Sequence, residues 1–249
     1  MKSKRRASSL RSPQASGGDT AEGGFQHQAG LICAKVPLWL TRDAFTEMIR
    51  EGLGDTEARF FDPARGVALE FVECKDHSLT PSEFWAEIEH FQELDEEVPG
   101  AYERFILASA GLSSGVKPIM NAVQRVRDAF PFYRDIDEVQ GASFDDLVAT
   151  VAQHGRPRSM AVFIFAKVAF EIDITDAEDH ARALFSVSLH KNYPECEELS
   201  GSVVRGAFSR LSQLLASRRG EPVKREELEG AIWQDTDLAP PSSEVRLHT

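Results

Sequence analysis

Apolar residues in the first part of the chain follow a helical spacing and are then gathered in two segments typical of strands. From Phe25 they follow a helical spacing, at Phe25, Ala29, Ile32, Cys33 and Val36, and Pro37 would disturb this helix near its end. Residues 57–61 and 67–75 are rich in strand-forming side chains and flank the turn-like sequence Asp62-Pro-Ala-Arg-Gly66. The pattern predicts one helix and then a β-hairpin.

Helix and strand patterns alternate in the next segment. Thr80-Pro81-Ser82-Glu83 resembles a helix start, and an apolar face from Phe84 to Leu94 predicts a helix over 81–97. The apolar run 104–110 ends at Gly111, as a buried strand would, and 116–130 returns to helical spacing. This order of elements predicts an α/β domain with a central mixed sheet covered by helices.

The pattern changes after this domain. Four amphipathic segments predict helices, and the apolar segment 161–174 fits a helix or a strand; the four are 144–151, 177–188, 200–218 and 225–232. We therefore expect a mainly helical second domain. The predicted division is a basic arm without a core over 1–21, an α/β domain over 22–138, a helical domain over 139–235 and a loose tail over 236–249.

Composition narrows the class of protein. The 249 residues are 42% hydrophobic and 27% charged, which is typical of globular chains, and no apolar stretch approaches the roughly 20 residues of a membrane span. The basic N-terminus lacks the apolar core of a secretory signal. The three cysteines, Cys33, Cys74 and Cys196, are far apart and odd in number. We expect reduced thiols and a cytoplasmic protein.

Charge is distributed unevenly along the chain. The net charge is −12, although residues 1–20 contain five Lys or Arg residues and only one Asp, so the remainder is strongly acidic. An acidic body argues against a protein that coats nucleic acid nonspecifically, because Lys and Arg contacts to phosphate supply most of that affinity. It leaves room for a small site with local positive charge.

One group of residues has a pattern suited to phosphodiester chemistry. Glu73 and Lys75, at the end of a predicted apolar strand, share a face because side chains alternate with a period of two. Carboxylates such as Asp62 and Glu73 are suitable magnesium ligands, and Lys75 could orient or deprotonate a water. The alternative is a solvated surface pair, but the preceding strand is too apolar for an exposed edge.

A resemblance supports the first interpretation. The segment Gly23-Gly24-Phe25-Gln26-His27-Gln28 looks like the Gly-Phe-x-Tyr-Gln entry of the double-stranded DNA endonuclease domain of bacterial antiphage effectors, including the SAVED-domain effectors of CBASS systems. These domains belong to the restriction-endonuclease-like, PD-(D/E)xK superfamily. The resemblance covers residues 19–135 through the Glu-x-Lys strand, and 160–235 also looks like the segment after the nuclease core in such proteins.

The resemblance implies a restriction-endonuclease-like fold and a metal-dependent double-stranded DNA endonuclease in antiphage defence. It matches Asp62, Glu73, Lys75 and Gln28 to catalytic positions, with Asp62 and Glu73 holding Mg²⁺ or Mn²⁺. The upstream metal-binding acid is Asp62, Glu57 or Glu70.

Other expectations concern partners. Three basic residues of the α/β domain are the best source of a surface for the DNA backbone, namely Lys117, Arg125 and Arg127, with Arg134 nearby. No ligand-sensing module is recognisable, so we expect control by homo-oligomerisation or by a partner such as a motor ATPase or a sensor. The alternatives are a catalytically inactive nuclease-fold adaptor and a nuclease for RNA or single strands.

Overall fold

The computed structural model describes residues 18–51, 55–64, 66–127, 136–172, 178–234 and 236. Its α-helices are α1 (Gly18–Leu40), α2 (Pro81–Glu97), α3 (Lys117–Arg127), α4 (Ile136–Gln153), α5 (Arg158–Lys167), α6 (Glu178–Asn192), α7 (Gly201–Ser217) and α8 (Arg225–Trp233). Its strands are β1 (Phe45–Glu51), β2 (Asp55–Asp62), β3 (Gly66–Leu79), β4 (Tyr102–Leu112), β5 (Val168–Ile172) and β6 (Pro222–Lys224).

The strands form one mixed sheet flanked by helices. Its order is β5-β4-β3-β2-β1-β6. The pairs β1–β2, β2–β3 and β1–β6 are antiparallel, whereas β4 and β5 are parallel. A parallel pair needs a crossover, and here the chain between β4 and β5 contains α3, α4 and α5. The mixed α/β class expected from the sequence is confirmed.

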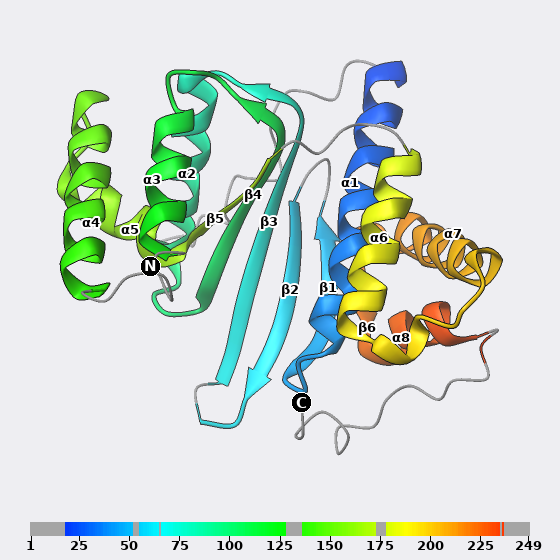
Figure 1. Ribbon diagram of the computed structural model, residues 1–249. Helices are drawn as coiled ribbons and strands as arrows, with labels where there is room; N and C mark the ends of the chain where they lie inside the picture. Colours follow the sequence, from blue (N-terminus) through cyan, green and yellow to red (C-terminus); the bar gives the residue numbers. More distant parts are fainter. Residues whose placement is uncertain are drawn as a thin grey trace, which may run out of the picture. The chain divides into compact units, whose positions relative to one another are not determined.

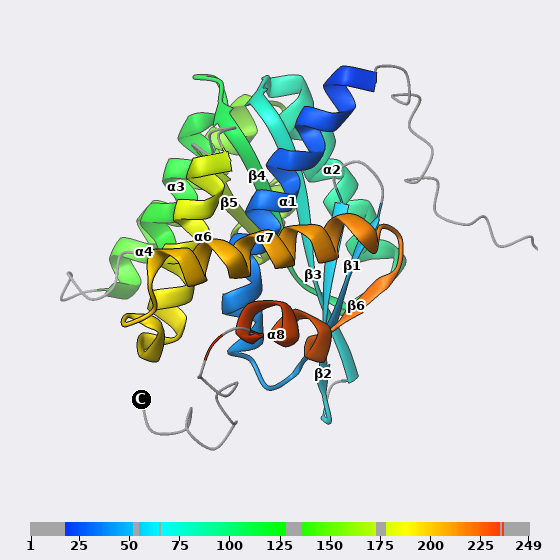
Figure 2. The same ribbon diagram turned by 90° about the vertical axis from the view of Figure 1, so that its right-hand side faces the viewer.

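Contacts divide the chain into two units, 1–76 with 175–249 and 77–174. In the first unit α1 and α6 run side by side, and α7 crosses near them (Figures 1 and 2). The helices pack through fully buried side chains such as Ile32 and Leu211, and Phe185 contacts Phe208 with ring centroids 5.7 Å apart. A Cβ added at Gly30 of α1 would lie 2.4 Å from the Cβ of Ala181 in α6. The glycine therefore permits the close approach of these two helices.

Arginine side chains close the ends of two helices in this unit. Arg225, at the start of α8, donates to the carbonyl oxygens of Leu40 and Arg42 at 2.7 and 3.0 Å, just where α1 ends. Arg210 of α7 donates to the carbonyl oxygen of Ala231 in the last turn of α8 at 2.9 Å. Carbonyl groups in a last helical turn lack intrahelical partners, and a cation there also meets the negative end of the helix dipole.

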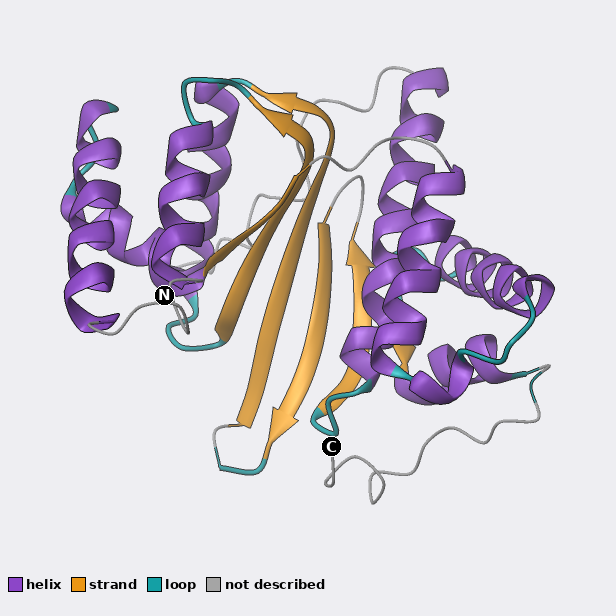
Figure 3. Ribbon diagram, viewed as in Figure 1, coloured by secondary structure: helices purple, strands orange, loops and turns teal. Residues whose placement is uncertain are grey.

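The second unit contains α2 to α5, β4 and β5 (Figure 3). Helix α2 begins with a complete capping box, in which Thr80 and Glu83 bind each other's backbone N–H groups. Its aromatic face packs on the strands: Phe91 stacks on Phe105 with centroids 5.0 Å apart, and Phe84 on Phe170 at 5.9 Å. These contacts make the face predicted for residues 81–97 a core surface.

Several predicted elements agree with the structure. The helix over 81–97 has its predicted bounds, the hairpin turns through Asp62 and Gly66, and the strand and helix after it are present as β4 and α3. Strands β1 and β6 were not predicted, and the ambiguous segment 161–174 contains most of α5 and all of β5. The predicted domain boundaries at 21, 138 and 235 stay predictions.

Candidate functional site

The β2–β3 hairpin orders its polar side chains on two faces. In its register Ala58 is opposite Glu70, and Asp55 is opposite Glu73. Because Glu70 and Glu73 are three residues apart, an extended strand sends their side chains to opposite faces. The alternation expected from the sequence is therefore present, and the two glutamates belong to different environments.

Glu73 and Lys75 form an ion pair on one face of β3. The Lys75 Nζ lies 2.8 Å from the Glu73 Oε1, and the side chains are 28% and 6% exposed, respectively. A carboxylate at this depth is costly without a partner, and the ammonium group supplies charge compensation. The structure thus brings together two of the residues predicted for the site.

Asp62 and Glu57 lie elsewhere on the hairpin. Asp62 pairs with Gly66 in the turn, where its Oδ1 accepts a hydrogen bond from the Ala64 N–H at 2.7 Å. Glu73 is seven positions further along β3, which corresponds to about 23 Å of strand. Glu57 binds the Arg59 Nε at 2.8 Å. Asp62 therefore acts as a turn residue and does not converge with Glu73 and Lys75.

Glu70 occupies a polar cluster on the opposite face of the hairpin. Its Oε2 accepts a hydrogen bond from the Trp39 indole N–H at 3.0 Å, and its Oε1 pairs with Arg42 at 2.5 Å. The Arg42 guanidinium also lies 3.7 Å from the centroid of the Phe60 ring. The cluster ties the last turn of α1 to β2 and β3, so it has a clear structural role.

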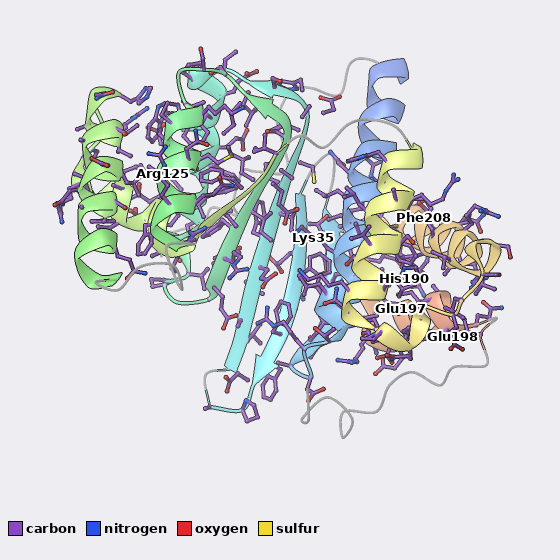
Figure 4. All side chains as sticks on the ribbon, in the orientation of Figure 1. Lys35, Arg125, His190, Glu197, Glu198 and Phe208 are labelled. Atoms are coloured by element: carbon purple, nitrogen blue, oxygen red, sulfur yellow. The ribbon has the colours of Figure 1, made fainter. Side chains whose placement is uncertain are left out.

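A polar stripe continues along α1. Gln28 and Lys35 are only 8% and 7% exposed, and their spacing from Trp39 places all three near one face of the helix. Lys35 is labelled along α1 in Figure 4. The Gln28 Oε1 is buried and accepts no hydrogen bond from the described residues. It is available to a donor from a water or a ligand.

Burial dominates the chemistry of the neighbouring ionisable groups. It raises the pKa of the Cys33 thiol to about 12, against a weaker lowering by the hydrogen bond to Ser212. It also lowers the pKa of Arg50, and the nearby positive charge of Arg219 lowers it further. Cys33 is thus an unreactive core thiol, and Arg50 and Arg219, here called the Arg50–Arg219 corner, are two positive charges close enough to repel each other.

The three residues predicted to contact DNA have different environments. Lys117 and Arg125 are exposed at the two ends of α3, and Arg125 is labelled in Figure 4. Arg127 instead donates to the carbonyl oxygens of Phe165 and Val168, both at 2.6 Å. It closes the end of α5, as Arg225 does for α1. Arg134 lies outside the described residues.

The part of the chain that the structure describes contains no preformed metal centre. There, no three His, Cys, Asp or Glu side chains form a group that could hold a metal ion. Magnesium or manganese binding stays a prediction. None of the helices among the described residues is both long and apolar enough to cross a membrane.

A shallow groove of about 420 Å³ lies on the hairpin near its turn. The apolar lining includes Phe61, Val67 and Leu69, and Glu57 and Arg59 lie beside them. Phe61 and Val67 are opposite each other in the register and are 53% and 57% exposed. Two large apolar side chains thus form one exposed surface.

Sequence patterns missed most of this polar arrangement. Trp39 and Arg42 follow Pro37, where we expected the helix to be disturbed, and Arg50 belongs to the unpredicted strand β1. One signal was present, because Gln28, Lys35 and Trp39 recur at spacings of seven and four residues on one helical face. Trp39 of this stripe contacts the sheet through its hydrogen bond to Glu70 of β3.

Comparisons with known proteins identify two curated relatives, and no protein-family model matches the sequence. The chain is 29% identical over 164 residues to CD-NTase-associated protein 4 of Moraxella osloensis, covering 66% of this chain and 35% of the relative. It is 26% identical over 235 residues to the protein of the same name from an Acinetobacter species, covering 91% and 48%. The chain spans less than half the length of these relatives.

Solved structures agree with this similarity. The Cap4 SAVED/CARF-domain containing receptor of Moraxella osloensis superposes with a TM-score of 0.69 at 24% identity, over 85% of this chain and 48% of the receptor. The Acinetobacter baumannii Cap4 receptor with the cyclic trinucleotide 2′3′3′-cAAA gives a TM-score of 0.68 at 24% identity, over 84% and 44%. The chain therefore shares its fold with about half of each receptor.

These findings correct the functional prediction. A metal-dependent DNA endonuclease is contradicted, because the similar structures are receptors, two of them with a cyclic trinucleotide. The restriction-endonuclease-like assignment is not confirmed, and the inactive adaptor rested on the same assignment. The roles of Asp62, Glu73, Lys75 and Gln28 stay untested predictions. The coarser resemblance is confirmed: the chain is similar to Cap4 receptors of CBASS antiphage systems.

Proposed function

We propose that this chain acts in antiphage defence as a module of a receptor that responds to a cyclic oligonucleotide. The observation that carries the proposal is the similarity to Cap4 receptors over 84–85% of the chain, at TM-scores of 0.68–0.69. Similarity over 91% of the chain to the curated Acinetobacter protein supports it independently of the structures. Since the chain spans only part of these relatives, the proposal concerns its contribution to such a receptor.

Local positive charge is the main requirement for contact with such a ligand. A cyclic trinucleotide has three negatively charged phosphates, whereas this chain carries a net charge of −12. The Arg50–Arg219 corner is the best candidate among the described residues. The Gly220 N–H donates to the Arg50 carbonyl oxygen at 2.8 Å, which holds Arg219 beside β1, and each guanidinium raises the electrostatic potential at the other. A phosphate there would relieve this repulsion.

Calorimetric titration of the 249-residue chain with 2′3′3′-cAAA and 3′3′3′-cAAA tests the proposal. We expect saturable binding to one of them, and at least tenfold weaker binding by Arg219→Ala. Arg205→Ala is the matched control, because Arg205 is also an exposed arginine, on α7, and should leave the affinity unchanged.

The outcomes separate two failures. If both variants weaken binding equally, or if neither weakens it, the Arg50–Arg219 corner is not the binding site, although the chain still binds the ligand. The absence of binding to a panel of cyclic di- and trinucleotides, by this chain and by any longer protein that contains it, would overturn the proposed function itself.

A further inference from the structure

The β2–β3 hairpin has an exposed apolar patch on one of its two faces. Phe60 is buried beneath Arg42 near the end of α1, and the next side chain, Phe61, is on the opposite face and more than half exposed. Val67 pairs with it directly and is also more than half exposed. The other exposed large apolar side chains of the described residues are each on a different element: Leu38 on α1, Val98 just after α2, Val162 on α5 and Val187 on α6. Single exposed side chains are common, but contiguous patches usually mark contacts.

Charged side chains of both signs lie beside this patch in equal number. The Arg59 Nε lies 2.8 Å from the Glu57 Oε1, and the Arg59 Nη1 lies 2.9 Å from the Glu47 Oε1. Lys224 of β6 is exposed and pairs with Glu47 in the register, so its side chain is on the same face. These two cations and two carboxylates cancel, whereas the whole chain has a net charge of −12. Two copies therefore repel each other over most of their surface, but not here.

An apolar patch flanked by both signs of charge is complementary to a copy of itself. In a two-fold interface every contact occurs twice, so the cations of one copy can lie opposite the carboxylates of the other. A ligand with charge of a single sign gains little, because one sign attracts it and the other repels it. The shallow groove of about 420 Å³ that Phe61 and Val67 line can also receive an apolar side chain of the second copy.

We propose that the Phe61–Val67 patch, with Glu47, Glu57, Arg59 and Lys224 at its rim, is a two-fold interface between two copies of this chain. The centre of the interface consists of few apolar side chains from each copy, so the dimer should be reversible, with a dissociation constant in the micromolar range. It forms without a cyclic oligonucleotide and is independent of the proposed function.

Sedimentation equilibrium of the 249-residue chain, without nucleotide and from micromolar to millimolar concentration, tests the interface. We expect a monomer–dimer equilibrium. Phe61→Asp should raise the dimer dissociation constant at least tenfold, because it places a carboxylate at the centre of the contact. Val187→Asp is the matched control: it adds the same charge at a valine that is 64% exposed on α6, and it should leave the dissociation constant unchanged.

A charge exchange tests the pairing across the two-fold axis. Arg59→Glu makes the rim net negative and Glu57→Lys makes it net positive, so each variant alone should dimerise at least tenfold more weakly than the wild type. An equimolar mixture of the two should form a heterodimer with at least the wild-type affinity.

Three outcomes would overturn the proposal. They are a wild-type chain that stays monomeric at millimolar concentration, equal effects of Phe61→Asp and Val187→Asp, and a mixture of the charge variants that associates no better than either variant alone. The first would assign the patch to a partner other than this chain. Because no measurement includes a cyclic oligonucleotide, failure here is distinct from failure of the proposed function.

Discussion

The close approach of α1 and α6 gives the sharpest test of the fold. In Gly30→Ala the new Cβ would lie 2.4 Å from the Ala181 Cβ, about 1.4 Å closer than ordinary contact between carbon atoms. Neither atom can rotate away, because each is attached directly to a helix backbone. The helices must separate or the backbone must shift, and overpacking of this kind costs about 1–3 kcal/mol.

Helix propensity acts in the opposite direction. Replacing glycine by alanine in a helix gains about 1 kcal/mol, so Gly30→Ala should destabilise the protein by a net amount of up to about 2 kcal/mol. For a chain of this size that corresponds to a fall of up to about 8 °C in Tm. Urea denaturation and differential scanning calorimetry would measure it.

A second substitution isolates the contact. Ala181→Gly removes the opposing Cβ, so Gly30→Ala made in that background should stabilise the protein by up to about 1 kcal/mol, a reversal of sign. Gly141→Ala on α4 is the matched control, because no atom lies within 4 Å of its new Cβ and it should also stabilise. If Gly30→Ala costs the same with and without Ala181→Gly, our account of the α1–α6 contact is wrong.

Three further predictions concern polar contacts. Arg127→Ala should destabilise the protein by about 1–2 kcal/mol in urea denaturation, because carbonyl groups at the end of α5 lose a charged donor. Arg125→Ala on the same helix is the control and should change the free energy of unfolding by less than about 0.5 kcal/mol. Hydrogen bonds from Thr80 lower the pKa of Glu83, so NMR titration should find the pKa of this carboxyl below its usual range. Thr80→Ala should raise this pKa. The stabilisation that the Glu83 carboxylate provides should be present above the ordinary glutamate pKa and be lost as the pH falls through the lowered value. Burial raises the pKa of Cys33 to about 12, so the thiol should resist iodoacetamide at pH 8 until urea unfolds the chain, and Tm should fall as the pH rises from about 9 towards 12. Rapid labelling of native Cys33, or a Tm that does not change over that range, would contradict this assignment.

The sequence predicted the elements whose stabilising interactions are local. The capping box at Thr80 and Glu83 fixes the start of α2, and the turn residues Asp62 and Gly66 fix the hairpin. In both cases the residues that determine the structure lie within a few positions of each other, so their spacing carries the information.

Elements held by distant partners were not predictable in the same way. Strand β1 mixes charged and apolar residues and is stabilised by pairing with β2 and with β6, which is more than 170 residues away. The candidate site shows the same limit. Period-two alternation correctly placed Glu73 and Lys75 together, but the separation of Asp62 depends on the hairpin register, and the register depends on pairing between strands.

The contact between Arg225 and the end of α1 has a consequence for how the chain acquires its structure during synthesis. The carbonyl groups of Leu40 and Arg42 receive these hydrogen bonds from a residue 183–185 positions later, and the 98 residues 77–174 of the other compact unit are made in between. At about 5–20 residues per second, at least about 5–20 s pass between the synthesis of the first helix and strands and the synthesis of α6 to α8. The intervening unit, being continuous in sequence, can fold during that interval. The N-terminal elements are therefore made first and completed last, and in the meantime the apolar surfaces of α1 and β1 are the ones that a chaperone would meet.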